Sequence, residues 1–261
     1  MSDSALPPRL SRLTFHGPLS EARAAQLVTR LRRHDPESVL DIGCGWGELM
    51  LRLLEGAPGA KGVGLDLTTA DLERGRRNAQ ERGLEGRVDF VEESATGTTR
   101  GPADVVLCLG SGQALVDGGE TDGDMPALSA TEAALRALRP LVTPGGRVLF
   151  GEGFWQRTPT PEELAAMWPG AREDDHVSLA AVADAATNAG FRIEWTETAT
   201  EEEWEHFESG YLADVEEWLA ANPEHSLAPE TRDRVDRHRA GWLRGYRGVL
   251  GFVMLTLIPV G

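Results

Sequence analysis

The stretch Val39-Leu40-Asp41-Ile42-Gly43-Cys44-Gly45-Trp46-Gly47-Glu48 decides the fold of this 261-residue chain. An apolar run ends in the pattern D-x-G-x-G-x-G, and a helix is expected to begin near Glu48. Glycines let a backbone turn tightly and approach a ligand at points where a Cβ atom would collide. The stretch therefore predicts a strand, a glycine-rich turn and a helix, with the turn as a candidate ligand site.

The spacing of these glycines separates two ligands that contain adenosine. A dinucleotide turn follows G-x-G-x-x-G and requires a glycine where this chain has Glu48, whose carboxylate would repel a pyrophosphate. Asp41 instead suits a cationic ligand such as the aminoacyl sulfonium of S-adenosylmethionine. Asp66 ends the next apolar run, at about the interval where an acid binds ribose hydroxyls. An NAD-binding enzyme remains the alternative.

Short apolar runs alternate with helix-like stretches through the middle of the chain, which predicts a parallel sheet covered by helices. Ser20 and Ser178 are expected to cap helices. The turn Pro144-Gly145-Gly146 is expected to lead into the fifth strand. The predicted strands are Ser38–Ile42, Gly62–Leu65, Arg87–Val91, Ala103–Leu109, Gly146–Phe150, Phe191–Thr196 and Val249–Ile258.

These motifs resemble those of the class I S-adenosylmethionine-dependent methyltransferases, over roughly residues 38–198 and the last strand. The resemblance implies an α/β fold with a Rossmann-like, seven-stranded, mostly parallel sheet in the order 3-2-1-4-5-7-6. In a single domain, residues 38–198 and 248–261 would form the core, and 1–37 an N-terminal helical lead. Residues 199–247 would form a helical cap inserted between strands six and seven. The segment Gly151–Trp155 resembles an uncharacterised bacterial branch of this family.

The resemblance also assigns residues to S-adenosylmethionine as the cofactor. The three glycines of the turn would wrap its methionine part, and Asp66 would bind its ribose. Glu93-Ser94-Ala95 stands at the adenine position, where Ser94 replaces the usual aspartate and Glu93 is the candidate substitute. No metal is expected. The expected cofactor-binding residues are Asp41, Gly43, Cys44, Gly45, Gly47, Asp66, Leu67, Glu93, Ser94, Ala95, Leu109, Gly110 and Gln113.

Three side chains are candidates for catalysis on the acceptor side, namely Glu152, His16 and Tyr211. Glu152 follows the fifth predicted strand between two glycines, where a partly desolvated carboxylate can act as a base. Its alternative is a solvated loop acid or an acid that caps the backbone. His16 is the second candidate base, or a surface histidine at a helix entry. Tyr211 shares a helical stripe with Trp204, Phe207 and Trp218, which either packs on the sheet or lines a pocket that selects the acceptor.

The composition of the chain disfavours some classes of binding partner. Acidic residues outnumber basic ones 42 to 26, which disfavours nucleic acids and anionic membranes. The Asn/Asp-Pro-Pro-aromatic tetrad of nucleobase and amide methyltransferases is absent, since Cys108–Ser111 stands in its place. Two cysteines, together with the lack of a signal-like or membrane-spanning apolar run, predict a cytoplasmic protein.

Two segments fall outside the strand–helix alternation, namely residues 199–247, which divide into two halves of opposite charge, and the loop Val116–Pro126. Ala199–Glu224 carries nine acidic residues and neither lysine nor arginine, whereas His225–Arg247 carries six arginines and three acids. Opposite charge on two neighbouring helices predicts a paired helical hairpin. The acidic loop Val116–Pro126 is a solvated loop or a metal site, although its spacing fits no Ca²⁺ loop.

The sequence therefore predicts methyl transfer from S-adenosylmethionine to a small-molecule acceptor, by O- or N-methylation, in a monomer or homodimer. A cofactor-binding module without methyl transfer and a protein methyltransferase are the alternatives.

Overall fold

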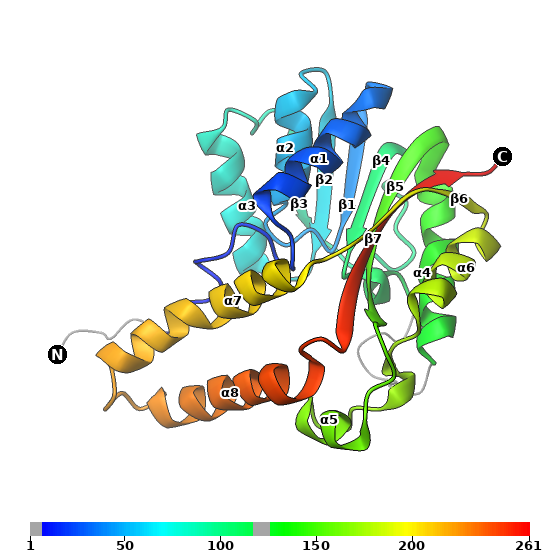
Figure 1. Cartoon of the computed structure of the whole chain (residues 1–261). Helices are drawn as coiled ribbons and strands as arrows, with labels where there is room; N and C mark the ends of the chain where they lie inside the picture. The colour runs from blue at the N-terminus through cyan, green and yellow to red at the C-terminus, as the bar shows by residue number, and fades with distance from the viewer. Residues whose placement is uncertain (1–6, 117–125) are drawn as a thin grey trace.

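The computed structural model describes residues 7–116 and 126–261, so most of the acidic loop Val116–Pro126 lies outside the described part. Seven strands form one sheet in the order β3-β2-β1-β4-β5-β7-β6 (Figure 1). β7 is antiparallel to β5 and β6, while the other pairs are parallel. The predicted order and orientation are confirmed. The strands are β1 (Ser38–Ile42), β2 (Lys61–Asp66), β3 (Val88–Glu92), β4 (Ala103–Leu109), β5 (Val142–Trp155), β6 (Phe191–Thr198) and β7 (Leu250–Pro259).

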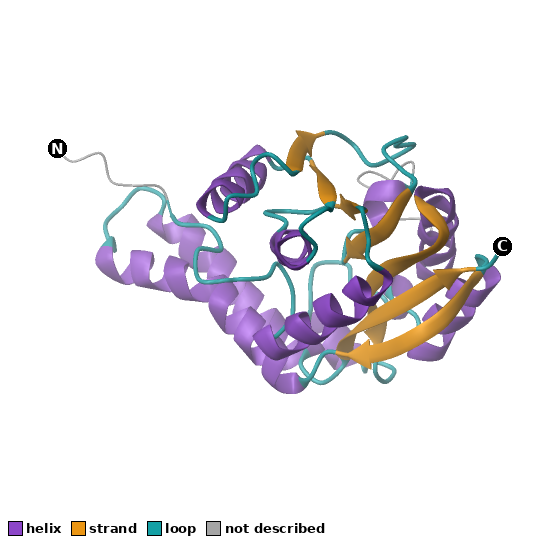
Figure 2. Ribbon diagram, turned by 90° about the horizontal axis from the view of Figure 1, so that it is seen from above, coloured by secondary structure: helices purple, strands orange, loops and turns teal. Residues whose placement is uncertain are grey.

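Helices cover both faces of the sheet, as parallel strands require (Figures 1 and 2). α1 (Glu21–Leu31), α2 (Glu48–Gly56) and α3 (Thr69–Glu81) pack on one face, and α4 (Ala127–Leu138) and α6 (Leu179–Asn188) on the other. The predicted caps are confirmed. The Ser20 hydroxyl accepts the Arg23 N–H at 3.3 Å, and the Ser178 hydroxyl accepts the Ala181 N–H at 3.3 Å.

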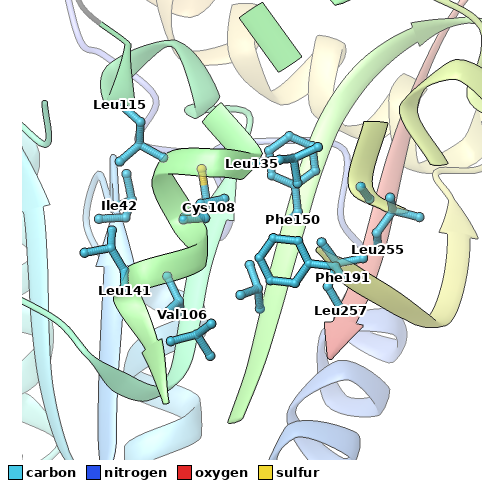
Figure 3. Close-up of a cluster of buried hydrophobic side chains, with 14 of the residues drawn as sticks. Ile42, Val106, Cys108, Leu115, Leu135, Leu141, Phe150, Phe191, Leu255 and Leu257 are labelled. Atoms are coloured by element: carbon cyan, nitrogen blue, oxygen red, sulfur yellow. The ribbon is translucent and has the colours of Figure 1, made fainter. Parts of the chain in front are cut away.

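Two buried apolar clusters lie on opposite faces of the sheet. Phe150 packs with Cys108 and Leu255 on the α4 and α6 face (Figure 3). Its neighbour in the strand, Leu149, packs with Met254 on the α1, α2 and α3 face. Because successive side chains of a strand point to opposite faces, one step along β5 moves a side chain from one cluster to the other.

β5 is longer at both ends than the predicted Gly146–Phe150. The predicted turn Pro144-Gly145-Gly146 lies at an irregularity in the β4 pairing, where the partners change from Ala103 and Val142 to Val105 and Arg147. At its far end β5 continues beyond β4, because antiparallel β7 supplies a partner as far as Trp155. Glu152 pairs with Val253 inside the strand, so its predicted place in a loop after the strand is wrong.

Two long helices follow β6 and lie side by side at one end of the sheet (Figure 1). They are α7 (Glu201–Ala221) and α8 (Ala228–Gly241), and the short helix α5 (Pro161–Ala166) lies near the end of α8. Arg239 pairs with Glu216 and Arg247 with Glu205, so the predicted pairing of an acidic with a basic segment is confirmed. None of the described helices is long and apolar enough to cross a membrane.

Candidate functional site

A cavity of about 870 Å³ opens at the carboxyl ends of β1, β2 and β4, the edge where open α/β sheets bind ligands. It is bounded by the glycine turn, by residues 15–19 of the N-terminal segment and by α7. Gly45 belongs to the same turn but does not line the cavity. The expected cofactor residues that line it are Asp41, Gly43, Cys44, Gly47, Asp66, Leu67, Glu93, Ser94, Ala95, Leu109, Gly110 and Gln113.

The glycine turn is fixed by close packing as well as by its backbone angles. Gly43 has φ +61°, and a Cβ atom there would lie 2.4 Å from the Cβ of Ser111. The Ser111 hydroxyl donates to the Ile42 carbonyl at 2.6 Å, which ties the turn to the end of β4. Packing against Ser111 therefore requires glycine at position 43, and the conformation of the turn is fixed before any ligand binds.

Asp66 joins the glycine turn to the end of β2. One carboxylate oxygen accepts the Gly45 N–H at 2.8 Å, and the other accepts the Thr68 N–H at 2.8 Å. A carboxylate oxygen can accept more than one hydrogen bond, so both keep capacity toward the cavity. Asp66 thus organises the turn and has carboxylate oxygen atoms on the cavity wall.

Asp41 is a buried carboxylate on the cavity wall, and no hydrogen bond to its side chain is found within the described residues. Burial raises its pKa to about 8, and the nearby Asp66 carboxylate acts in the same direction. A buried acid without a partner is stabilised when a cation binds beside it. Asp41 therefore fits the ammonium or sulfonium end of a cationic ligand.

The segment expected at the adenine position differs from the expected carboxylate site. Glu93 forms an exposed ion pair with Arg100 at 2.6 Å, which lowers the pKa of Glu93. The Ser94 hydroxyl accepts the Thr96 N–H at 3.3 Å. Leu67 lines the same end with 59% of its surface exposed. Apolar contact is thus available there, while the Glu93 carboxylate already has a partner.

The other end of the cavity has an apolar wall, and this end is called here the apolar lobe. Sequence reasoning missed half of this wall, namely Leu107, Phe252 and Met254, because an apolar strand residue reads as core when the face on which it lies is not known. Trp204 and Phe207 belong to the predicted aromatic stripe, of which these two members reach the cavity. The apolar lobe consists of Leu107 and Leu109 from β4, Trp204 and Phe207 from α7, and Phe252 and Met254 from β7.

His16 lines the cavity beside the glycine turn. Its ring stacks on Trp46 with the centroids 5.1 Å apart, and a Cβ atom on Gly45 would lie 3.6 Å from its Nδ1 atom. The Trp46 indole donates to the Thr14 carbonyl at 2.7 Å, which fixes the ring on which His16 rests. Partial burial lowers the pKa of His16 below 6.5, so its imidazole is neutral at neutral pH and able to accept a proton.

Glu152 does not line the cavity, which runs against its expected role as the acceptor base. It points to the face that holds Phe150, whereas the apolar lobe shares the face of Leu107 and Met254. One carboxylate oxygen accepts the Gly153 N–H at 3.0 Å, and the other lies near buried Gly112. Burial raises the pKa of Glu152 to about 7. Strand alternation, which sequence reasoning did not apply here, accounts for this placement.

Tyr211 also lies outside the cavity lining. Its ring stacks on His238 with the centroids 4.6 Å apart. Both His238 and the Tyr246 hydroxyl contact the buried Glu208, at 2.7 and 2.8 Å. The tyrosines therefore belong to a polar cluster that joins α7 to the end of α8, and neither Tyr211 nor Tyr246 lines this cavity.

Comparisons with known proteins agree with this fold. A family model described as a methyltransferase domain matches residues 33–205. The uncharacterized protein YjhP of Escherichia coli K12 is 27% identical over 245 residues, which cover 94% of this chain and 93% of that protein. Its X-ray structure has a TM-score of 0.79 and 25% identity, covering 97% of this chain and 100% of that one.

Two similar structures carry a ligand. S-adenosylmethionine-dependent methyltransferases from Geobacter sulfurreducens and Thiobacillus denitrificans were solved with S-adenosylhomocysteine and are 25% and 26% identical to this chain. Both have a TM-score of 0.78 and cover 97% of this chain and 98% of their own.

Proposed function

The chain belongs to the methyltransferase-domain family, and from this we propose that it transfers a methyl group from S-adenosylmethionine to a small acceptor molecule. The observation that carries the proposal is a single cavity with two chemically different ends. One end holds the Asp41 and Asp66 carboxylates at a glycine turn, and the other is the apolar lobe. A cationic adenosine ligand fits the first end, and a second molecule fits the other.

The residues at the polar end match the groups of the cofactor. Asp41 is a buried carboxylate without a partner in the described part of the chain, which suits the cationic methionine end. Asp66 presents its carboxylate to the ribose hydroxyls. When bound, S-adenosylmethionine supplies a methyl carbon that is already activated by a positively charged sulfur. The protein therefore has mainly to hold and align the two reactants.

His16 is the proposed base for an acceptor that arrives protonated. It lines the cavity, and its depressed pKa keeps a neutral imidazole available at neutral pH. General-base catalysis requires a group within reach of the proton to be removed, with a pKa near or below the working pH. His16 lines the cavity and its pKa is lowered, whereas the Glu152 side chain lies outside the cavity lining.

The walls of the apolar lobe favour a small acceptor over a protein segment. The N-terminal segment is fastened to α7 beside the cavity, because buried Glu203 accepts hydrogen bonds from the Ser20 hydroxyl at 2.7 Å and from Arg23 at 2.8 Å. Buried Asp214 accepts the Ser11 N–H at 2.7 Å in the same way. These contacts hold the N-terminal segment and α7, which both contribute residues to the cavity lining, against each other.

Two measurements test the proposal. S-adenosylhomocysteine should raise the melting temperature of the protein, whereas NADH should not. With labelled S-adenosylmethionine, the label should appear in small molecules of a metabolite extract. Label found only in protein would make the chain a protein methyltransferase. Binding of S-adenosylhomocysteine without any transfer from the extract would support a cofactor-binding module instead.

A further inference from the structure

The apolar lobe carries information about the chemical class of the acceptor. Its surface comes from aromatic and aliphatic side chains of β4, β7 and α7. Phe252 approaches the strand next to it so closely that a Cβ atom on Gly151 would lie 2.7 Å from its ring. Flat aromatic side chains offer large contact areas to a flat apolar ligand. The chemistry of the lobe thus suits an aromatic ring.

The charges of the cavity exclude an anionic acceptor. Neither lysine nor arginine occurs among the described residues that line it, and residues 1–6 and 117–125 contain neither in their sequence. Four acids line the cavity outside the apolar lobe, namely Asp41, Glu48, Asp66 and Glu93, of which Glu48 and Glu93 already pair with arginines. A carboxylate or phosphate moved from water into such a lobe would lose its hydration without gaining a positive partner.

The position of His16 adds a condition on the reacting group. An imidazole removes a proton more readily from a phenolic hydroxyl, whose ordinary pKa is about 10, than from an aliphatic hydroxyl, which resembles water with a pKa of about 15.7. The six residues that form the apolar lobe include no carboxylate, so a protonated amine bound there would lose its hydration without an ion-pair partner. An aromatic hydroxyl is therefore the reacting group that agrees with both the wall and His16.

We infer that the acceptor is an uncharged, largely apolar aromatic molecule, which binds in the apolar lobe and is methylated on an aromatic hydroxyl beside His16. This inference rests on the proposed function. The hydroxyl proton passes to the His16 imidazole, and the oxygen uses its electron pair to bond the methyl carbon. The carbon–sulfur bond breaks with its electron pair on sulfur, which leaves S-adenosylhomocysteine and an aryl methyl ether.

Three probes that share one ring system test the acceptor class. The full-length protein, saturated with S-adenosylhomocysteine, is titrated in a calorimeter at pH 7.5 with 2-naphthol, 2-naphthoate and (2-naphthyl)methylammonium. We expect 2-naphthol to bind at least tenfold more tightly than either charged probe. Labelled S-adenosylmethionine should then give 2-methoxynaphthalene. Equal or tighter binding of a charged probe would overturn the inference, as would failure of all three to bind. Failure of S-adenosylhomocysteine itself to bind would instead refute the proposed function.

Matched substitutions on α7 test the location. Trp204→Ala removes part of the apolar lobe, and Tyr211→Ala removes an aromatic ring from the same helix outside the cavity lining. We expect the first to weaken 2-naphthol binding at least tenfold and the second to leave it within about threefold, with S-adenosylhomocysteine affinity retained in both.

A conservative change at the same position guards against general disruption of α7. The Trp204 indole nitrogen is buried and finds no hydrogen-bond partner in the described part of the chain. Trp204→Phe should therefore keep most of the affinity for 2-naphthol, because it retains a ring without breaking a hydrogen bond. Retained 2-naphthol affinity in Trp204→Ala, with S-adenosylhomocysteine still bound, would remove the acceptor from the lobe.

Discussion

The two ends of the cavity are built in opposite ways. The cofactor end comes from short continuous stretches after β1, β2 and β3, held by backbone contacts such as those of the Asp66 carboxylate. The apolar lobe brings together β4, β7 and α7, which lie far apart in the sequence. The first end depends on particular residues in a fixed order. The second depends on which faces of separate elements meet.

The largest effect is expected at His16, which lines the cavity beside the glycine turn. His16→Gln removes the proposed base, so kcat with an aromatic hydroxyl should fall by about 10²- to 10⁴-fold. The wild-type rate should rise with pH through the His16 pKa, which lies below 6.5, and then level off, because the imidazole must be free of its proton. Initial rates between pH 5 and 8 measure both effects, and this rising limb should be missing in the variant.

His206→Gln serves as the matched control, because His206 is an exposed histidine on α7 outside the cavity lining. Its rate and pH profile should follow those of the wild type. A His16→Gln variant whose kcat stays within twofold of the wild type would show that the acceptor needs no base from this side of the cavity.

Asp66→Ala tests the cofactor end. The substitution removes an acceptor of two backbone hydrogen bonds at 2.8 Å as well as the proposed ribose contact. Hydrogen bonds to a charged group contribute about 1.5–3 kcal/mol each, so the Kd for S-adenosylhomocysteine should rise at least ~10-fold. Calorimetry measures this change. Asp66→Asn keeps one acceptor oxygen, so its Kd should lie between those of the wild type and Asp66→Ala. An unchanged Kd in Asp66→Ala would refute the site.

The contrast between the ends also shows what the sequence could predict. Asp41, the glycine turn and Asp66 are close in the chain, and their spacing by itself indicates a ligand, so all were predicted. Phe252 and Met254 carry no such signal, because an apolar residue in a buried strand reads as core whether or not a cavity lies in front of it. Locating them requires the strand order together with the face on which each residue lies.

Glu152 shows the same limit in a single side chain. Its position near the carboxyl edge of the sheet was correctly recognised, but not its face, which depends on the length and register of β5. Because successive side chains of a strand point to opposite faces, a shift of one residue along β5 decides whether this side chain points toward the cavity or toward the cluster around Phe150.

The placement of Glu152 predicts a pH-dependent stability. Its pKa is raised from 4.5 to about 7 in the folded protein. An acid whose pKa is raised in the folded state contributes to stability fully below pH 4.5, and this contribution is lost as the pH rises through 7. The loss in the free energy of unfolding is on the order of 3 kcal/mol. Relative to wild type, Glu152→Gln should gain unfolding free energy between pH 5 and pH 8. Urea unfolding at the two pH values measures the difference.

The exposed Glu85 provides the comparison for this titration, since Glu85→Gln should show no such gain. Glu152→Gln should also keep kcat within a few fold of the wild type. A fall of 100-fold or more, with S-adenosylhomocysteine affinity intact, would return Glu152 to the role of acceptor base and would mean that the acceptor approaches from the other face of the sheet.

The smallest effect is expected at the adenine end, from Glu93→Gln. Glu93 is only partly exposed and is already paired with Arg100, so its carboxylate has little to offer a ligand, and the Kd for S-adenosylhomocysteine should change by less than about twofold. Leu67→Ala at the same end should weaken binding more, by about fivefold, because a bound ligand would cover its exposed apolar surface. If Glu93→Gln instead proves the more damaging of the two, the Glu93 carboxylate must leave Arg100 to hold the ligand. The cofactor end would then rearrange on binding, and would no longer be the preformed half of the cavity.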